Sequence, residues 1–202
     1  MNPTILIIAL ILPILLIQIK VFPYKFRFIA HLIGFLFILF LIIFYSYTPY
    51  DLGIRFDNFA EGIIPYSLIT ATMSFALIIY AKITKQKTVK HPFLLPHFQY
   101  GFLILSILQE LIYRGLLIPV LVSANFSFIA TVITSSTIFA YLHIIYPNSV
   151  RNVFFSFILG IFYAVIYLTY PNLILISISH AVLNFLALYY QLVGPIFNKK
   201  KE

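Results

Sequence analysis

Seven long apolar runs, almost free of charge, dominate the sequence and restrict what the chain can fold into. Of its 202 residues, 62% are hydrophobic and only 9% are charged, whereas a typical globular chain has about 25% charged residues. So few charges cannot cover the surface of a water-soluble domain of this size. Each run approaches the roughly 20 residues that span a bilayer as a helix. The sequence therefore predicts an all-α, polytopic integral membrane helical bundle, with residues 1–202 forming one membrane domain.

About seven transmembrane helices are expected. Their predicted bounds are 4–19, 28–47, 63–81, 98–122, 126–146, 153–170 and 173–193. The connection at 48–62 contains Pro and Gly, which disfavour a continuous helix. It is expected to be re-entrant or to lie along the membrane surface. We find no internal repeat, which disfavours a small transporter built from inverted repeats.

The basic residues predict the orientation of the chain. In a seven-span topology, 11 of the 13 Lys and Arg residues lie on the same side, at 20, 25, 27, 82, 85, 87, 90, 151 and 199–201. Because Lys and Arg accumulate on the cytoplasmic side, we expect the N-terminus outside and the C-terminus in the cytoplasm. The net charge of +8 is thus explained by topology and contact with membrane lipids, and no nucleic-acid partner is expected. Richness in Ile, Phe, Tyr and Lys favours AT-rich coding and a multi-pass protein of a bacterial plasma membrane.

A few polar side chains lie inside the predicted spans, where an ionised group costs about 2.5–3.5 kcal/mol. The fourth span contains Gln109, Glu110 and Arg114, the fifth His143, and the seventh His180 and Asn184. Glu110 and Arg114 are four residues apart, so they share a helix face and can form an ion pair. Phe139 with His143, and His180 with Asn184, repeat this spacing. In lipid, such polar faces should point at one another or into a cavity.

Together these groups suit the attack of water on a carbonyl, with amide and imidazole donors for an oxyanion. The chain has no Cys, and no Ser has a convincing adjacent base. A zinc site made of Glu110, His143 and His180 is the chemical alternative. The absence of an H-E-x-x-H motif and the competition of Arg114 for the carboxylate disfavour it, so we expect no metal or other cofactor.

Three motifs occur in order: Q-E-x-x-x-R at 109–114, F-x-x-x-H at 139–143 and H-x-x-x-N at 180–184. The set resembles the CAAX protease and bacteriocin-processing (CPBP, Abi) family of glutamate-dependent intramembrane proteases, over a core at 98–190. The resemblance implies an endopeptidase that uses activated water on a membrane-associated peptide or a lipidated protein C-terminus. It assigns water activation to Gln109 and His143, oxyanion binding to His180 and Asn184, and structural pairing to Glu110 with Arg114. Phe139 would have a structural or substrate-orienting role.

Gln109 departs from the family pattern, which has a carboxylate at this position. A carboxamide does not accept a proton near neutral pH, so the chain as written is expected to be crippled or inactive as a protease. Three explanations stay open: a deliberate Glu-to-Gln exchange, a natural protein that binds peptides without cleaving them, or a takeover by Glu110, which Arg114 opposes. The alternative function is accordingly a non-catalytic peptide-binding membrane protein, serving bacteriocin self-immunity or scaffolding.

Overall fold

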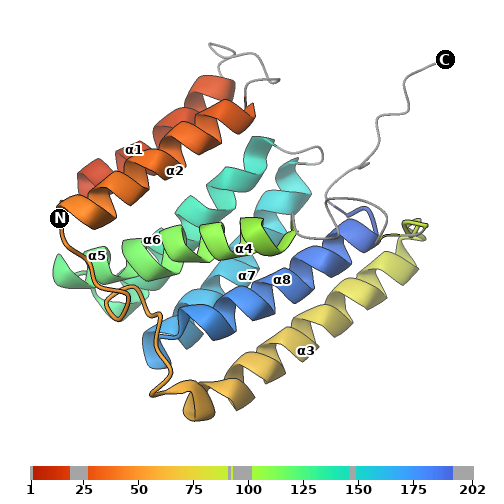
Figure 1. The fold of residues 1–202 in the computed structure, drawn as a ribbon. Helices are drawn as coiled ribbons and strands as arrows, with labels where there is room; N and C mark the ends of the chain where they lie inside the picture. The colour runs from red at the N-terminus through yellow and green to blue at the C-terminus, as the bar shows by residue number, and fades with distance from the viewer. Residues whose placement is uncertain (1, 19–26, 91, 93–101, 146–148, 193–202) are drawn as a thin grey trace.

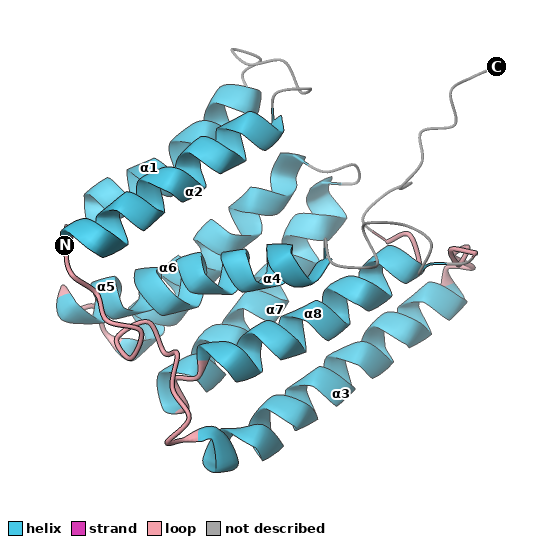
Figure 2. Cartoon of the chain, in the orientation of Figure 1, coloured by secondary structure: helices cyan, strands magenta, loops and turns pink. Residues whose placement is uncertain are grey.

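The structure is a computed structural model that describes residues 2–18, 27–90, 92, 102–145 and 149–192. All regular structure in these ranges is helical, as Figure 2 shows. The α-helices are α1 (Pro3–Gln18), α2 (Arg27–Phe44), α3 (Phe59–Ile83), α4 (Phe102–Glu110), α5 (Leu117–Ser123), α6 (Phe128–Tyr141), α7 (Ser149–Thr169) and α8 (Leu173–Tyr189). A π-helical turn, Leu111–Leu116, joins α4 to α5, and a 3₁₀ turn, Leu142–Ile145, follows α6. The all-α prediction is confirmed for this part of the chain.

Three helices in the described ranges are long and apolar enough to cross a membrane by length and composition. They are Phe59–Ile83, Phe102–Ser123 and Val150–Thr169. Four further apolar helices are shorter: Pro3–Leu16, Phe35–Phe44, Phe128–Ile144 and Leu173–Tyr189. These helices support a helical membrane protein. Seven spans, and the side on which each terminus lies, stay predictions.

Two predicted spans differ from the structure. α3 begins at Phe59 and includes Gly62 and Pro65. The connection predicted for residues 48–62 therefore ends before Phe59. Gly62 lies where a Cβ would come within 2.9 Å of the Leu175 side chain, so its small size allows α3 to approach α8 closely. The fourth span is interrupted by the π-helical turn. The span ends predicted at 19, 98, 146 and 193 lie outside the described residues.

The π-helical turn has a local cause in the sequence. Pro119 follows it and has no N–H with which to bond the carbonyl of Gly115, so the regular helical ladder is weakened there. Single π turns inside α-helices are frequent at functional sites. Gly115 also lies against the loop between α2 and α3, because a Cβ at this position would be 3.0 Å from the carbonyl oxygen of Leu52.

Helix α8 lies at the centre of the contacts that matter for function. It packs mainly against α3 and α4, while α6 packs most extensively against α7. Figure 1 shows α1 and α2 side by side on one flank and α3 beside α8 on the other. α8 is therefore positioned to bring its side chains to those of α4.

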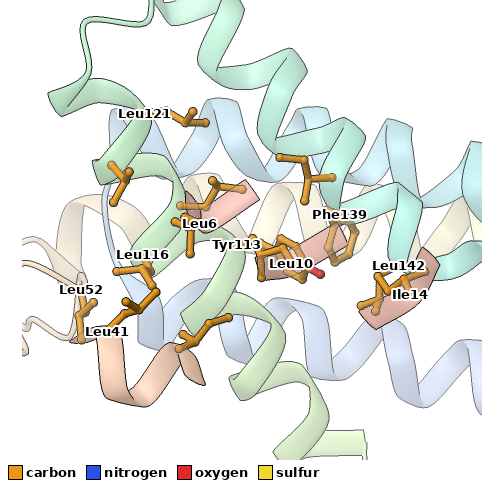
Figure 3. Packing of buried hydrophobic residues seen from close by; sticks show 14 residues of the cluster. Leu6, Leu10, Ile14, Leu41, Leu52, Tyr113, Leu116, Leu121, Phe139 and Leu142 are labelled. Atoms are coloured by element: carbon orange, nitrogen blue, oxygen red, sulfur yellow. The ribbon is translucent and has the colours of Figure 1, made fainter. Parts of the chain in front are cut away.

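Buried apolar side chains form two clusters that hold these helices. Figure 3 shows the first, in which Leu6, Leu10 and Ile14 of α1 pack near Tyr113 and Phe139. The second joins α3, α7 and α8, and includes Tyr66, Tyr163, Tyr167, Ile176 and Leu183. The polar residues of the candidate site lie where these clusters meet, because Phe139 belongs to the first and Tyr163 to the second.

The loop between α2 and α3 is tied to the turn between α7 and α8. Asn172 Nδ2 donates to the carbonyl of Arg55 at 3.0 Å and to Asn58 Oδ1 at 2.9 Å. Asn58 Nδ2 donates to the carbonyl of Pro171 at 3.1 Å. These hydrogen bonds of Asn58 and Asn172 fix the start of α8. In the same loop, the Arg55 guanidinium beside Asp57 lowers the pKa of that carboxyl.

Gly53 is the tightest point of this connection, and we expect its replacement by Ala to destabilise the fold. Its φ is +76°, a conformation that disfavours side chains, and a Cβ would lie 2.2 Å from the hydroxyl of Tyr167. Gly53→Ala should lower the free energy of unfolding in detergent by about 1–3 kcal/mol. Phe56→Ala, in the same loop at a side chain that is 75% exposed, is the control and should change it by about 0.5 kcal/mol or less. Equal stability of the two variants would contradict the role given to Gly53.

Candidate active site

A buried carboxylate, Glu110, is the centre of the candidate site. Its Oε1 accepts a hydrogen bond from His180 Nδ1 at 2.5 Å and lies 3.3 Å from Arg114 Nη1. The three side chains are 0%, 1% and 2% exposed for Glu110, Arg114 and His180. Charge-assisted hydrogen bonds of this kind are about twice as strong as neutral ones. The structure therefore places the predicted Glu110–Arg114 pair together and adds His180, from a helix 70 residues away in sequence, as a second partner.

Aromatic rings hold the Arg114 side chain in place. Its guanidinium carbon lies 4.3 Å from the ring centre of Phe139 and 5.5 Å from that of Tyr163. Desolvated cation–π contacts can contribute about 2 kcal/mol. The same two rings also make edge contacts with the His180 ring, at centroid distances of 5.7 and 5.8 Å. These contacts are compatible with the structural or substrate-orienting role predicted for Phe139, which stays a prediction.

His143 lies on the 3₁₀ turn that follows α6. Its Nδ1 is 3.0 Å from the carbonyl oxygen of Phe139, and its ring packs on the Phe139 ring. Because a carbonyl oxygen only accepts hydrogen bonds, this contact requires the proton on Nδ1. In the neutral ring, Nε2 is then the proton-accepting nitrogen. This tautomer is the one that a general base needs.

One cavity brings four of the predicted site residues together, including Phe139. It has a volume of about 150 Å³, and His143, His180 and Asn184 lie in its wall beside apolar side chains of α3 and α7. Asn184 is oriented from α4, since its Nδ2 donates to Ser106 Oγ at 2.9 Å. The other carboxamide, Gln109, is buried at 6% exposure but is not among the residues that line the cavity. Its predicted role in water activation together with His143 therefore stays a prediction.

Tyr163, Ser179 and Thr70 support the site but were not predicted from the sequence. The Tyr163 hydroxyl lies 2.8 Å from Ser179 Oγ, and Thr70 Oγ1 donates to the same oxygen at 2.6 Å. These bonds connect α3, α7 and α8 directly beside His180. Tyr163 is completely buried, and a buried Tyr hydroxyl usually needs a partner. A polar group inside an apolar run was the available signal, but tyrosines are too frequent near span ends for that signal to be distinctive.

The described residues also bear on metal binding. Within these ranges there is no group of three His, Asp or Glu side chains that could hold a metal ion. Glu110 instead directs one oxygen to both His180 and Arg114. Its second oxygen, Oε2, is buried without a hydrogen-bond partner among the described residues.

The fold and this site define an all-helical membrane protein with a buried carboxylate–imidazole–guanidinium cluster beside a cavity. Residues 91–186 match the family model described as type II CAAX prenyl endopeptidase Rce1-like. This match confirms the resemblance predicted from the three motifs. No curated protein and no solved structure matches the chain.

Removing either partner of the Glu110–Arg114 pair should destabilise the protein strongly, because it leaves the other charge buried without its ion-pair partner. We expect Glu110→Gln and Arg114→Met each to lower the free energy of unfolding by about 3–5 kcal/mol. The double variant should lose clearly less than the sum. Chemical unfolding in detergent measures all three, with Lys82→Met at an exposed position as the control. Additive losses would show that the two residues do not interact.

Proposed function

We propose that the chain is built as a CAAX-type intramembrane endopeptidase of a bacterial plasma membrane. Its substrate would be a membrane-associated peptide or a lipidated protein C-terminus, and activated water would hydrolyse the peptide bond. The observation that carries the proposal is the shared cavity of His143, His180 and Asn184, backed by the buried Glu110. The family of residues 91–186 supports the same reaction class.

The geometry suggests how the described residues would divide the work. His143 Nε2 would accept a proton from the attacking water, because Nδ1 is directed to the Phe139 carbonyl. His180 would donate from Nε2 to the developing oxyanion while its Nδ1 stays bonded to Glu110. That carboxylate stabilises a protonated imidazole, in the way that a buried Asp supports the His of a hydrolase triad. Asn184, oriented by Ser106, would supply a second donor to the oxyanion.

Position 109 limits the rate in this proposal. Gln109 cannot take up the proton that a carboxylate would accept. Glu110 does not replace it in this proposal, because Arg114 and His180 stabilise its ionised form and Glu110 is not among the residues that line the cavity. We therefore propose that the chain as written binds substrate but cleaves it slowly or not at all.

Gln109→Glu should restore cleavage, since a positioned general base typically contributes about 10²–10⁴ in rate. The measurement is the cleavage of membrane-associated peptide precursors from the host, followed by mass spectrometry with protein in lipid nanodiscs. Adding His143→Ala or His180→Ala to Gln109→Glu should abolish the gain. The matched control is Gln86→Glu, at a position outside α3 and outside the cavity wall, which should leave cleavage at its original level.

A correctly folded Gln109→Glu protein that cleaves no peptide class would contradict the endopeptidase proposal. The alternative function, a non-catalytic peptide-binding protein for bacteriocin self-immunity or scaffolding, is favoured by one observation, the carboxamide at 109. It predicts that cells keep the immunity or scaffolding phenotype with Gln109 and also with His143→Ala. Loss of the phenotype with His143→Ala would favour catalysis.

We also propose that hydrolysis needs no metal ion. Among the described residues no three His, Asp or Glu side chains are grouped so that they could hold a metal ion, and Oε1 of Glu110 is already shared by His180 and Arg114. Elemental analysis of the purified Gln109→Glu protein should find well under one zinc per chain, and chelators should leave its cleavage rate unchanged. Stoichiometric zinc, together with loss of activity on chelation, would overturn this part of the proposal.

A further inference from the structure

The cavity contains a cation that the mechanism does not use, the guanidinium of Arg151. Arg151 lies in the first turn of α7 and forms part of the cavity wall, together with His180 and Asn184. One of its nitrogens, Nη2, donates to the carbonyl of Leu192, just beyond α8. An arginine has five N–H donors, so this bond occupies only part of the guanidinium. The sequence had explained Arg151 only as a marker of topology.

The charge of the cavity is one-sided. Its wall is formed mainly by apolar side chains of α3, α7 and α8, and none of the lining residues is Asp or Glu. Apart from Arg151, its ionisable residues are His143, His180 and Tyr80. A guanidinium in apolar surroundings, with no carboxylate among the described residues of the cavity wall, favours a ligand that brings its own anion.

The polar groups along the cavity favour a peptide over a fatty acid. Asn152, Ser156 and Asn184 all lie in the wall between apolar neighbours. Amide and hydroxyl groups in such positions can bond to the backbone of an extended peptide, whereas an acyl chain offers them no partner. The free α-carboxylate of a peptide with apolar side chains suits both the Arg151 guanidinium and the mixed polar and apolar cavity wall.

The distance between Arg151 and the candidate site suits this ligand. Tyr163 packs on His180 and lies on α7, as does Arg151. The rise of an α-helix puts their Cα atoms about 18 Å apart along the axis. An extended peptide covers about 3.5 Å per residue. A carboxylate on Arg151 would therefore place a bond within about five residues of the C-terminus beside His180 and Asn184.

We propose that Arg151 binds the free C-terminal carboxylate of the substrate peptide and so determines which bond reaches the site. This inference rests on the proposed function for the identity of the reacting bond. The binding of the carboxylate does not depend on hydrolysis. It can therefore be tested with the chain as written, in which Gln109 is retained.

The test compares two apolar hexapeptides that differ only at the C-terminus, one a free acid and one a carboxamide. Binding to the full chain in nanodiscs is measured by fluorescence anisotropy. A charge-assisted bond should make the acid bind about 10- to 100-fold more tightly than the amide. Arg151→Gln should bind acid and amide equally, and Arg151→Lys should keep part of the preference. Lys82→Gln, an exposed cation outside the cavity wall, should keep all of it.

Three results would overturn the proposal: equal binding of acid and amide by the unchanged protein, a preference that survives Arg151→Gln, or displacement of the acid peptide by an equally long fatty acid at equal concentration. Binding of the amide by Arg151→Gln shows that this variant is folded. If it is not folded, the unchanged protein and Arg151→Lys still decide the outcome. Failure of Gln109→Glu to cleave would reject the endopeptidase and leave the carboxylate preference standing, so the two failures can be told apart.

Discussion

The carboxylate of Glu110 is the group on which the rest of the structure depends. It is completely buried, and its Oε1 serves both His180 and Arg114. Apolar helices in lipid gain little from hydrophobic association with one another, so polar contacts and close packing select their partners. A charge at this depth has to be compensated. The contact of α4 with α8 follows from that requirement, and so does the stacking of Arg114 on rings from α6 and α7.

The sequence predicted the helical class and the ion pair because both follow from local rules. Lipid leaves little choice but helices, and a spacing of four residues puts Glu110 and Arg114 on one face. The link from Glu110 to His180 joins residues far apart in the chain, so periodicity could not predict it. The three motifs suggested only that their helices converge. They assigned His180 to oxyanion binding without the carboxylate that orients its ring.

Other features were not predicted because they depend on contacts between residues that lie far apart in the sequence. Gly62 disfavours a helix and was predicted to lie in a connection, yet α3 begins at Phe59, and the small glycine allows close packing against α8. The π-helical turn combines the missing N–H of Pro119 with the approach of a distant loop to Gly115. Tyr163 supports the site through Ser179, but as one of 15 tyrosines it had no distinguishing pattern.

The structure separates the group that carries the fixed charge from the groups that can meet substrate. Glu110 is not among the residues that line the cavity, whereas His143, His180 and Asn184 are. If Glu110 left His180 to act as a free base, Arg114 would keep a buried positive charge without its only hydrogen-bond acceptor among the described residues, at a cost of several kcal/mol. That cost opposes the takeover of catalysis by Glu110. In the proposed mechanism, the carboxylate that activates water would stand at position 109, where this chain has a carboxamide.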